Sequence, residues 1–82
     1  MFDVEFSDLA ATKFRKLDRA VRERIAAKLR SVAKDPARHL KRLSGVEAFT
    51  LRIGDWRLIL DVDWEDETLI VLTLGHRSTV YG

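Results

Sequence analysis

Hydrophobic and polar residues alternate one by one through the middle of the chain. In residues 49–60, FTLRIGDWRLIL, apolar side chains occupy every second position on both sides of Gly54-Asp55. This alternation around a two-residue turn predicts a β-hairpin, because successive side chains of a strand point to opposite faces and glycine readily adopts the positive φ that such turns need. The loop pairs Arg52 with Arg57 on the face away from the apolar side chains, where opposed like charges destabilise a sheet.

The N-terminal half of the chain follows a different period. Residues 2–6 alternate and predict a short first strand, and Ser7 is a good N-cap for a helix after it. Apolar residues then recur every three or four positions, which predicts amphipathic helix as far as Asp35-Pro36, where proline disfavours the helical conformation of the residue before it. Asp18 can serve as the N-cap of a second helix, which predicts a helical hairpin for this segment. One long helix is the alternative.

An almost unbroken apolar run, LIVLTLG, covers residues 69–75. Such a run predicts a strand that is buried on both faces. If Ile70, Leu72 and Leu74 face the helices, alternation turns Arg77 to the opposite side of the sheet, which is the side of the two hairpin arginines.

These elements follow one another as a strand, two helices and then three or four antiparallel strands. That order predicts an α+β fold in one domain, residues 1–82, with an N-terminal helical hairpin packed on one face of a small twisted antiparallel sheet. Arg52, Arg57 and Arg77 would then converge on the other face of the sheet.

The net charge of +2 is unevenly distributed along the chain. Residues 13–42 contain twelve Lys or Arg and three acids, a net charge of +9. Residues 43–82 have a net charge of −4, and their three cations are all arginines, namely Arg52, Arg57 and Arg77. The basic block fits a polyanionic partner or an acidic protein.

Several classes of protein are excluded by composition. The chain has no cysteine, and its two histidines, His39 and His76, are too few and too far apart to indicate a zinc site. No apolar run approaches the ~20 residues that span a bilayer, and the acidic N-terminus does not resemble a signal peptide. We therefore expect a cytoplasmic protein with no metal, no other cofactor and no membrane partner.

Clustered arginines are suited to phosphate, because each guanidinium offers planar donors that match phosphate oxygens in pairs. Fixed cations also stabilise the charge that builds on the oxygens of a reacting phosphate. In RNA the neighbouring 2′-hydroxyl is a ready nucleophile, so such a site needs a proton acceptor but no metal. Tyr81, four residues after Arg77, is the candidate for proton transfer, and its ring could also stack on a base.

Simpler roles are open for the same residues. An arginine on the outer face of a sheet is often solvated, or paired with a cross-strand acid such as Asp61. Tyr81 could pack its ring against the edge of the sheet, and the basic residues of the helices could form a solvated face. Three arginines in an otherwise acidic half of the chain favour the functional interpretation.

Three motifs, KRLSG at 41–45, LRIGDWRLIL at 51–60 and LGHRSTVY at 74–81, resemble those of the RelE/ParE superfamily of type II toxins. The resemblance extends over nearly the whole chain and is closest to RelE-type messenger-RNA interferases, especially archaeal-like ones. It implies a RelE-like fold, in agreement with the elements predicted above. It also implies ribosome-dependent cleavage of messenger RNA in the A site, by attack of the 2′-hydroxyl on the adjacent phosphate and without a metal.

The resemblance implies a catalytic role for four residues. Arg52, Arg57 and Arg77 match arginines that bind and stabilise the reacting phosphate. Tyr81 matches a C-terminal tyrosine that stacks on the substrate or helps to orient it.

Two further residues are expected to bind RNA, namely Lys41 and Arg42 in the basic motif before the hairpin. The chain departs from some superfamily members in having Ala48 and Thr50 where those members have lysines, one of which is thought to be the general base. The resemblance therefore leaves the identity of the base open.

Partners are also implied by the resemblance. A cognate antitoxin would wrap the toxin and neutralise its basic surface, operator DNA would be bound only through the toxin–antitoxin complex, and messenger RNA and the ribosome would be the targets. Two other functions are open: a ParE-like toxin that inhibits DNA gyrase without cutting RNA, and a plain nucleic-acid binder that uses the helix charges of residues 13–42.

Overall fold

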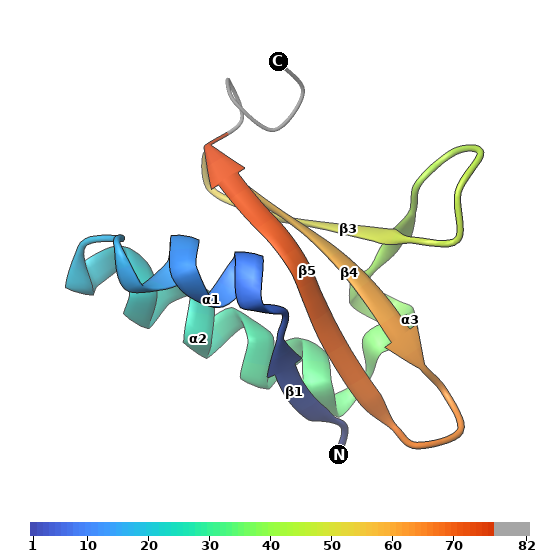
Figure 1. Cartoon of the computed structure of the whole chain (residues 1–82). Coiled ribbons are helices and arrows are strands. Elements are labelled where there is room, and N and C mark those ends of the chain that lie inside the picture. Colours follow the sequence, from blue (N-terminus) through green and yellow to red (C-terminus); the bar gives the residue numbers. More distant parts are fainter. Residues whose placement is uncertain (77–82) are drawn as a thin grey trace.

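The computed structural model describes residues 1–76, in which three helices and five strands follow one another along the chain (Figure 1). One short strand precedes the helices, and the other strands come after them, as the hydrophobic pattern predicts. The elements are β1 (Asp3–Phe6), α1 (Asp8–Arg15), α2 (Arg19–Lys34), α3 (Pro36–His39), β2 (Lys41–Arg42), β3 (Phe49–Ile53), β4 (Trp56–Asp63) and β5 (Thr68–His76).

The helical hairpin is broken where the sequence predicts it, so the alternative of one long helix is wrong. The Ser7 hydroxyl accepts a hydrogen bond from the amide of Ala10 at 3.0 Å and caps α1. Asp18 precedes α2, and its carbonyl accepts from the amide of Arg22, although its carboxylate makes no capping bond. Pro36 ends α2 and then opens the helical turn α3, because proline fits the first position of a helix.

The strands form one mixed sheet in the order β1-β5-β4-β3-β2. Strands β2 to β5 pair antiparallel with their neighbours, as predicted, whereas β1 runs parallel to β5. The expectation of a purely antiparallel sheet is therefore wrong for the first strand. The helices and the strands β2 to β4 together form the long connection that a parallel pair requires.

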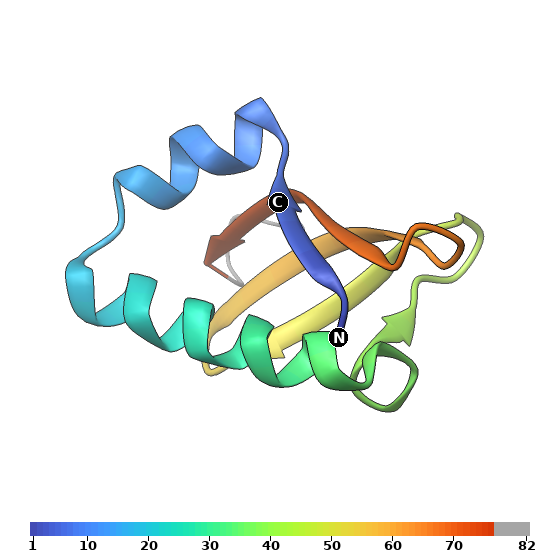
Figure 2. The same cartoon turned by 90° about the horizontal axis from the view of Figure 1, so that it is seen from below.

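The helices α1 and α2 lie on one face of this sheet, and the core forms between them (Figure 2). Burial of each large aliphatic side chain stabilises the fold by about 1.5–3 kcal/mol. The main core residues are Ile25, Leu29 and Val32 of α2 with Leu51, Leu58, Leu60, Leu69, Val71 and Leu74 of the sheet.

The strand β5 contains a β-bulge that alternation alone does not predict. Leu60 pairs with Val71 and Ile59 pairs with Thr73, so Leu72 is an extra residue between them. The bulge reverses the side-chain parity of the strand. Leu69 and Val71 are buried in the core, whereas Ile70 lies on the outer face with its partner Asp61 and Leu72 is 36% exposed. The predicted faces of Ile70, Val71 and Leu72 are therefore wrong, as is the expectation that this strand is buried on both faces, while Leu74 is buried as expected.

The residue Ser7 holds the bulge from the neighbouring strand. Its amide donates to the carbonyl of Val71 at 2.9 Å, and its hydroxyl donates to the carbonyl of Leu72 at 2.7 Å. After the bulge, Gly75 pairs with Arg57 and lies on the outer face of the sheet with it. Ser7 therefore couples the start of α1 to the bulge in β5, which precedes the cross-strand partner of Arg57 in the same strand.

Candidate functional site

The two hairpin arginines lie opposite each other, as the alternation predicts. The register pairs Arg52 with Arg57 and Ile53 with Trp56, and Gly54 has a φ of +59° in the turn. Arg52 is exposed and Arg57 is half-buried. Opposed like charges destabilise a strand pair, so the arrangement opposes the stability of the hairpin and points to a binding role.

A groove of about 420 Å³ lies beside this pair. It forms because β2 has only two residues and pairs with β3 only as far as Thr50, while α2 passes along the rest of the β3 edge (Figure 2). Five elements contribute its lining residues, which are Lys28 of α2, His39 of α3, Lys41 of β2, Thr50, Leu51 and Arg52 of β3, and Arg57 of β4.

The groove has a uniform electrostatic character. Four Lys or Arg side chains and one histidine line it, and no Asp or Glu of residues 1–76 does so. Asp61, the acid considered above as a cross-strand partner, lines a different concavity, and its Oδ1 accepts a hydrogen bond from the amide of Val62 at 2.9 Å. Cations gathered in a concave site focus their potential, so the groove attracts anions.

The two predicted RNA-binding residues are separated by the structure. Lys41 pairs with Thr50 and lines the groove of the hairpin arginines. Arg42 pairs with Phe49 and lines a second concavity, in which two carboxylates, those of Glu47 and Asp61, also lie. Only Lys41 therefore belongs to the same site as the arginine pair.

A buried hydroxyl lies in the groove. The Thr50 Oγ1 is shielded from solvent and has no hydrogen-bond partner among the described residues. An unsatisfied buried polar group costs about 1–3 kcal/mol. Thr50 is one of the two positions discussed above at which some superfamily members have a lysine. In this structure it lines the same groove as Arg52 and Arg57.

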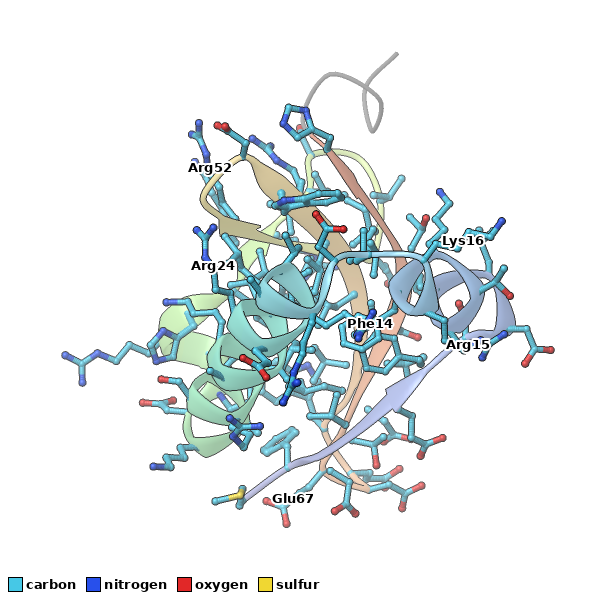
Figure 3. All side chains as sticks on the ribbon, turned by 90° about the vertical axis from the view of Figure 1, so that its left-hand side faces the viewer. Phe14, Arg15, Lys16, Arg24, Arg52 and Glu67 are labelled. Atoms are coloured by element: carbon cyan, nitrogen blue, oxygen red, sulfur yellow. The ribbon has the colours of Figure 1, made fainter. Side chains whose placement is uncertain are left out.

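Three site residues escaped the sequence interpretation. Lys28 and His39 line the groove, and the Arg24 guanidinium lies over the hairpin turn, where a Cβ added to Gly54 would be 2.7 Å from its Nη2. Figure 3 shows Arg24 and Arg52 on the same side of the molecule. Arg24 and Lys28 are four residues apart, so they lie on one helix face, and this spacing could have indicated a shared site. The same spacing is also typical of basic residues on a solvated helix face.

Two predicted catalytic residues, Arg77 and Tyr81, lie outside the described residues. The described part of β5 ends at His76, whose ring contacts Trp56 edge-to-face with centroids 5.6 Å apart. Arg77 follows Gly75 by two positions in the sequence, and Gly75 is the cross-strand partner of Arg57.

The residues that the structure describes form neither a metal-binding cluster nor a membrane-spanning helix. No three His, Asp or Glu side chains within residues 1–76 gather closely enough to hold a metal ion. In the same part of the chain, no helix is both long enough and apolar enough to cross a membrane.

Sequence comparison identifies the family. A family model described as the ParE toxin of type II toxin–antitoxin systems, parDE, matches residues 4–81. This match covers almost all of the 82 residues, so the chain belongs to this toxin family. The resemblance to the RelE/ParE superfamily is thereby confirmed. No curated protein sequence matches the chain.

Solved structures of RelE toxins share the fold, which confirms the predicted α+β class. The isolated RelE toxin of E. coli is 28% identical, with a TM-score of 0.81 over 99% of this chain and 92% of that chain. A chain of the intact E. coli RelBE toxin–antitoxin complex is 27% identical, with a TM-score of 0.78 over 93% and 96%. A chain of the archaeal RelE–RelB complex from Pyrococcus horikoshii OT3 has a TM-score of 0.79 over 95% and 97%, and at 21% identity it shows the fold alone.

Proposed function

We propose that this toxin is an endoribonuclease that cuts messenger RNA in the ribosomal A site. The observation that carries the proposal is the opposed pair of Arg52 and Arg57 in a groove that no acid of residues 1–76 lines. Guanidiniums hold phosphate oxygens in pairs and stabilise the charge that develops on them during phosphoryl transfer. The similarity to the E. coli RelE toxin supports the proposal.

The reaction needs no group beyond RNA and protein. The 2′-oxygen bonds to the adjacent phosphorus while the bond from phosphorus to the 5′-oxygen of the next nucleotide breaks. The 2′-hydroxyl gives up its proton, and the departing 5′-oxygen takes one up. Arg52 and Arg57 hold the non-bridging oxygens in this scheme, Arg77 adds a third cation, and Tyr81 transfers a proton or orients the base.

Primer extension on messenger RNA in a purified translation system tests the proposal. We expect cuts within A-site codons, present only with ribosomes, and a loss of about 10²-fold or more in Arg57→Ala and in Arg77→Ala, the scale of losing one charge-stabilising donor. Arg15→Ala is the matched control, because Arg15 is exposed on α1, on the far side of the molecule from Arg52 (Figure 3). Cleavage at the wild-type level in Arg57→Ala would show that Arg52 and Arg57 do not bind the reacting phosphate.

Inhibition of DNA gyrase is the second candidate function, because the matching family model is that of ParE toxins. A supercoiling assay distinguishes the two. Intact message together with inhibited supercoiling would assign the chain to gyrase, and the arginine groove would then serve a protein contact.

We propose that the toxin acts in the cytoplasm. We also propose that a cognate antitoxin is its protein partner there. The similarity to a chain of the E. coli RelBE toxin–antitoxin complex supports this partner. The antitoxin would cover the basic surface, and operator DNA would be bound only through the complex. Co-purification of the toxin with the product of an adjacent gene is the expected result.

A further inference from the structure

The groove contains more basic side chains than one phosphate requires. Beyond the arginine pair, Lys28, His39 and Lys41 line it from α2, α3 and β2, and Thr50 of β3 lines it as well. We name Lys28, His39 and Lys41 the helix-side cluster. Thr50 and Arg52 are two residues apart along one strand, ~6.6–7 Å, which is of the order of one nucleotide step in an extended strand.

The backbone holds the helix-side cluster in place. The helical turn that ends at His39 is anchored at its start by the buried Pro36, whose carbonyl accepts from the amide of Leu40 at 2.9 Å. Leu40 packs against the core, and Lys41 then pairs with Thr50 in the sheet. The short segment from the proline to β2 therefore directs two of the three side chains to the groove.

The cluster lacks a counter-charge in the described part of the chain. Lys28 is a half-buried cation, the His39 imidazole is half-buried as well, and no acid of residues 1–76 lines the groove. A half-buried cation without an acid gains from an anionic ligand, because charge-assisted hydrogen bonds are stronger than neutral ones. The buried Thr50 hydroxyl, without a partner among residues 1–76, is a further donor of the kind that contacts phosphate in nucleic-acid complexes.

We infer that the helix-side cluster is a second phosphate site, so that the groove binds two consecutive phosphates of single-stranded RNA. One phosphate lies on the arginine pair, where cleavage takes place, and the neighbouring one lies between Lys28, His39 and Lys41. The inference rests on the proposed function, whose cleavage site it extends along the substrate. The cluster positions the strand and carries no sequence information, because it recognises backbone phosphate.

Binding of short RNAs with methylated 2′-oxygens tests the inference, because such strands cannot be cut. A dinucleotide with one phosphate and a trinucleotide with two are titrated into the wild type at low salt. We expect the second phosphate to improve the affinity about tenfold, the scale of one charge-assisted hydrogen bond. Lys28→Gln and Lys41→Gln should reduce that gain to less than about threefold, and the ratio of the two affinities in each variant is the quantity compared.

The variants are chosen to keep the fold. Glutamine retains most of the aliphatic stem of lysine, so packing is preserved while the charge is lost. Lys16→Gln is the matched control, since Lys16 is exposed on α1 and does not line the groove. It should bind both RNAs as the wild type does.

The outcomes separate the inference from the proposed function. Arg57→Ala should weaken the binding of both RNAs. If it weakens the binding of neither, the proposal that the arginine pair binds phosphate is wrong. If Arg57→Ala weakens both RNAs but Lys28→Gln and Lys41→Gln keep the full gain, the second phosphate site is wrong and the proposed function stands. Unchanged RNA binding with loss of binding to a glutamate-rich peptide would assign the cluster to an acidic protein segment and overturn the inference.

Discussion

At the scale of single residues, Thr50 shows how stability and binding oppose each other in this protein. Its hydroxyl is buried in the groove without a partner among the described residues, although its β-branched carbon suits a strand. A valine in its place keeps the shape and removes the unsatisfied oxygen. The hydroxyl is therefore expected to contribute to ligand binding rather than to folding.

We predict that Thr50→Val raises the free energy of unfolding by about 1 kcal/mol, because removing an unsatisfied buried polar group relieves its desolvation cost. The same variant should bind the methylated trinucleotide more weakly. Urea denaturation and RNA titration measure the two effects. Thr50→Ser, which keeps the hydroxyl, is the control for binding. A less stable Thr50→Val protein would mean that the hydroxyl has a partner in solution.

At the scale of secondary-structure elements, the contacts between α1 and β5 determine the geometry near the site. Ser7 satisfies four groups with its backbone and side chain: the amides of Ala10 and Ala11 and the carbonyls of Val71 and Leu72. The bulge at Leu72 then sets which side chains of β5 share a face with Arg57. One polar residue thus joins a helix start to the register of a distant strand.

We predict that Ser7→Ala lowers the free energy of unfolding by about 1–2 kcal/mol, through loss of the cap and of the bond to Leu72. Ser7→Asp should retain the cap but lose the donor, so it separates the two contributions. Hydrogen exchange of the amides in the second half of β5 should accelerate in both variants. Asp18→Ala serves as the comparison, because the Asp18 side chain makes no capping bond and its loss should change stability little. Equal effects at Ser7 and Asp18 would contradict this account of the cap.

At the scale of the whole molecule, charge is separated between two regions. Basic residues dominate the helices and the groove, whereas the turn between β4 and β5 is acidic. Its acids are Glu65, Asp66 and Glu67, with Asp63 at the end of β4 beside them, and Figure 3 shows Glu67 at the end of the molecule away from Arg52. Such a charge distribution turns the groove toward an approaching polyanion. The rate of association with the polyanion should fall as salt screens this attraction.

The groove makes folding sensitive to ionic strength. We predict that raising the salt from about 0.01 M to 0.15 M, which shortens the Debye length from ~30 Å to ~8 Å, increases the melting temperature. The reason is that the repulsion between Arg52 and Lys41 is screened while no acid of residues 1–76 lines the groove. The double variant Arg52→Gln, Lys41→Gln should be more stable at low salt and should respond less. A wild type that salt destabilises would show that the attractive ion pairs dominate.

Local physical chemistry determined much of this fold, and those parts could be predicted from the sequence. Alternation with a Gly-Asp turn fixes the hairpin register, so the opposition of Arg52 and Arg57 follows from nearest neighbours along the chain. The cap at Ser7 and the proline at 36 likewise act within one helical turn. These signals need no knowledge of the rest of the chain.

Tertiary structure decided the rest, because it depends on residues far apart in the sequence. The parallel pairing of β1 with β5 and the bulge at Leu72 bring together segments about 65 positions apart, and the bulge then overrides the simple alternation of β5. The same holds for the groove. Lys28 and His39 read as ordinary helix-surface residues in the sequence, and they join the arginine pair only because α2 packs along the open edge of β3.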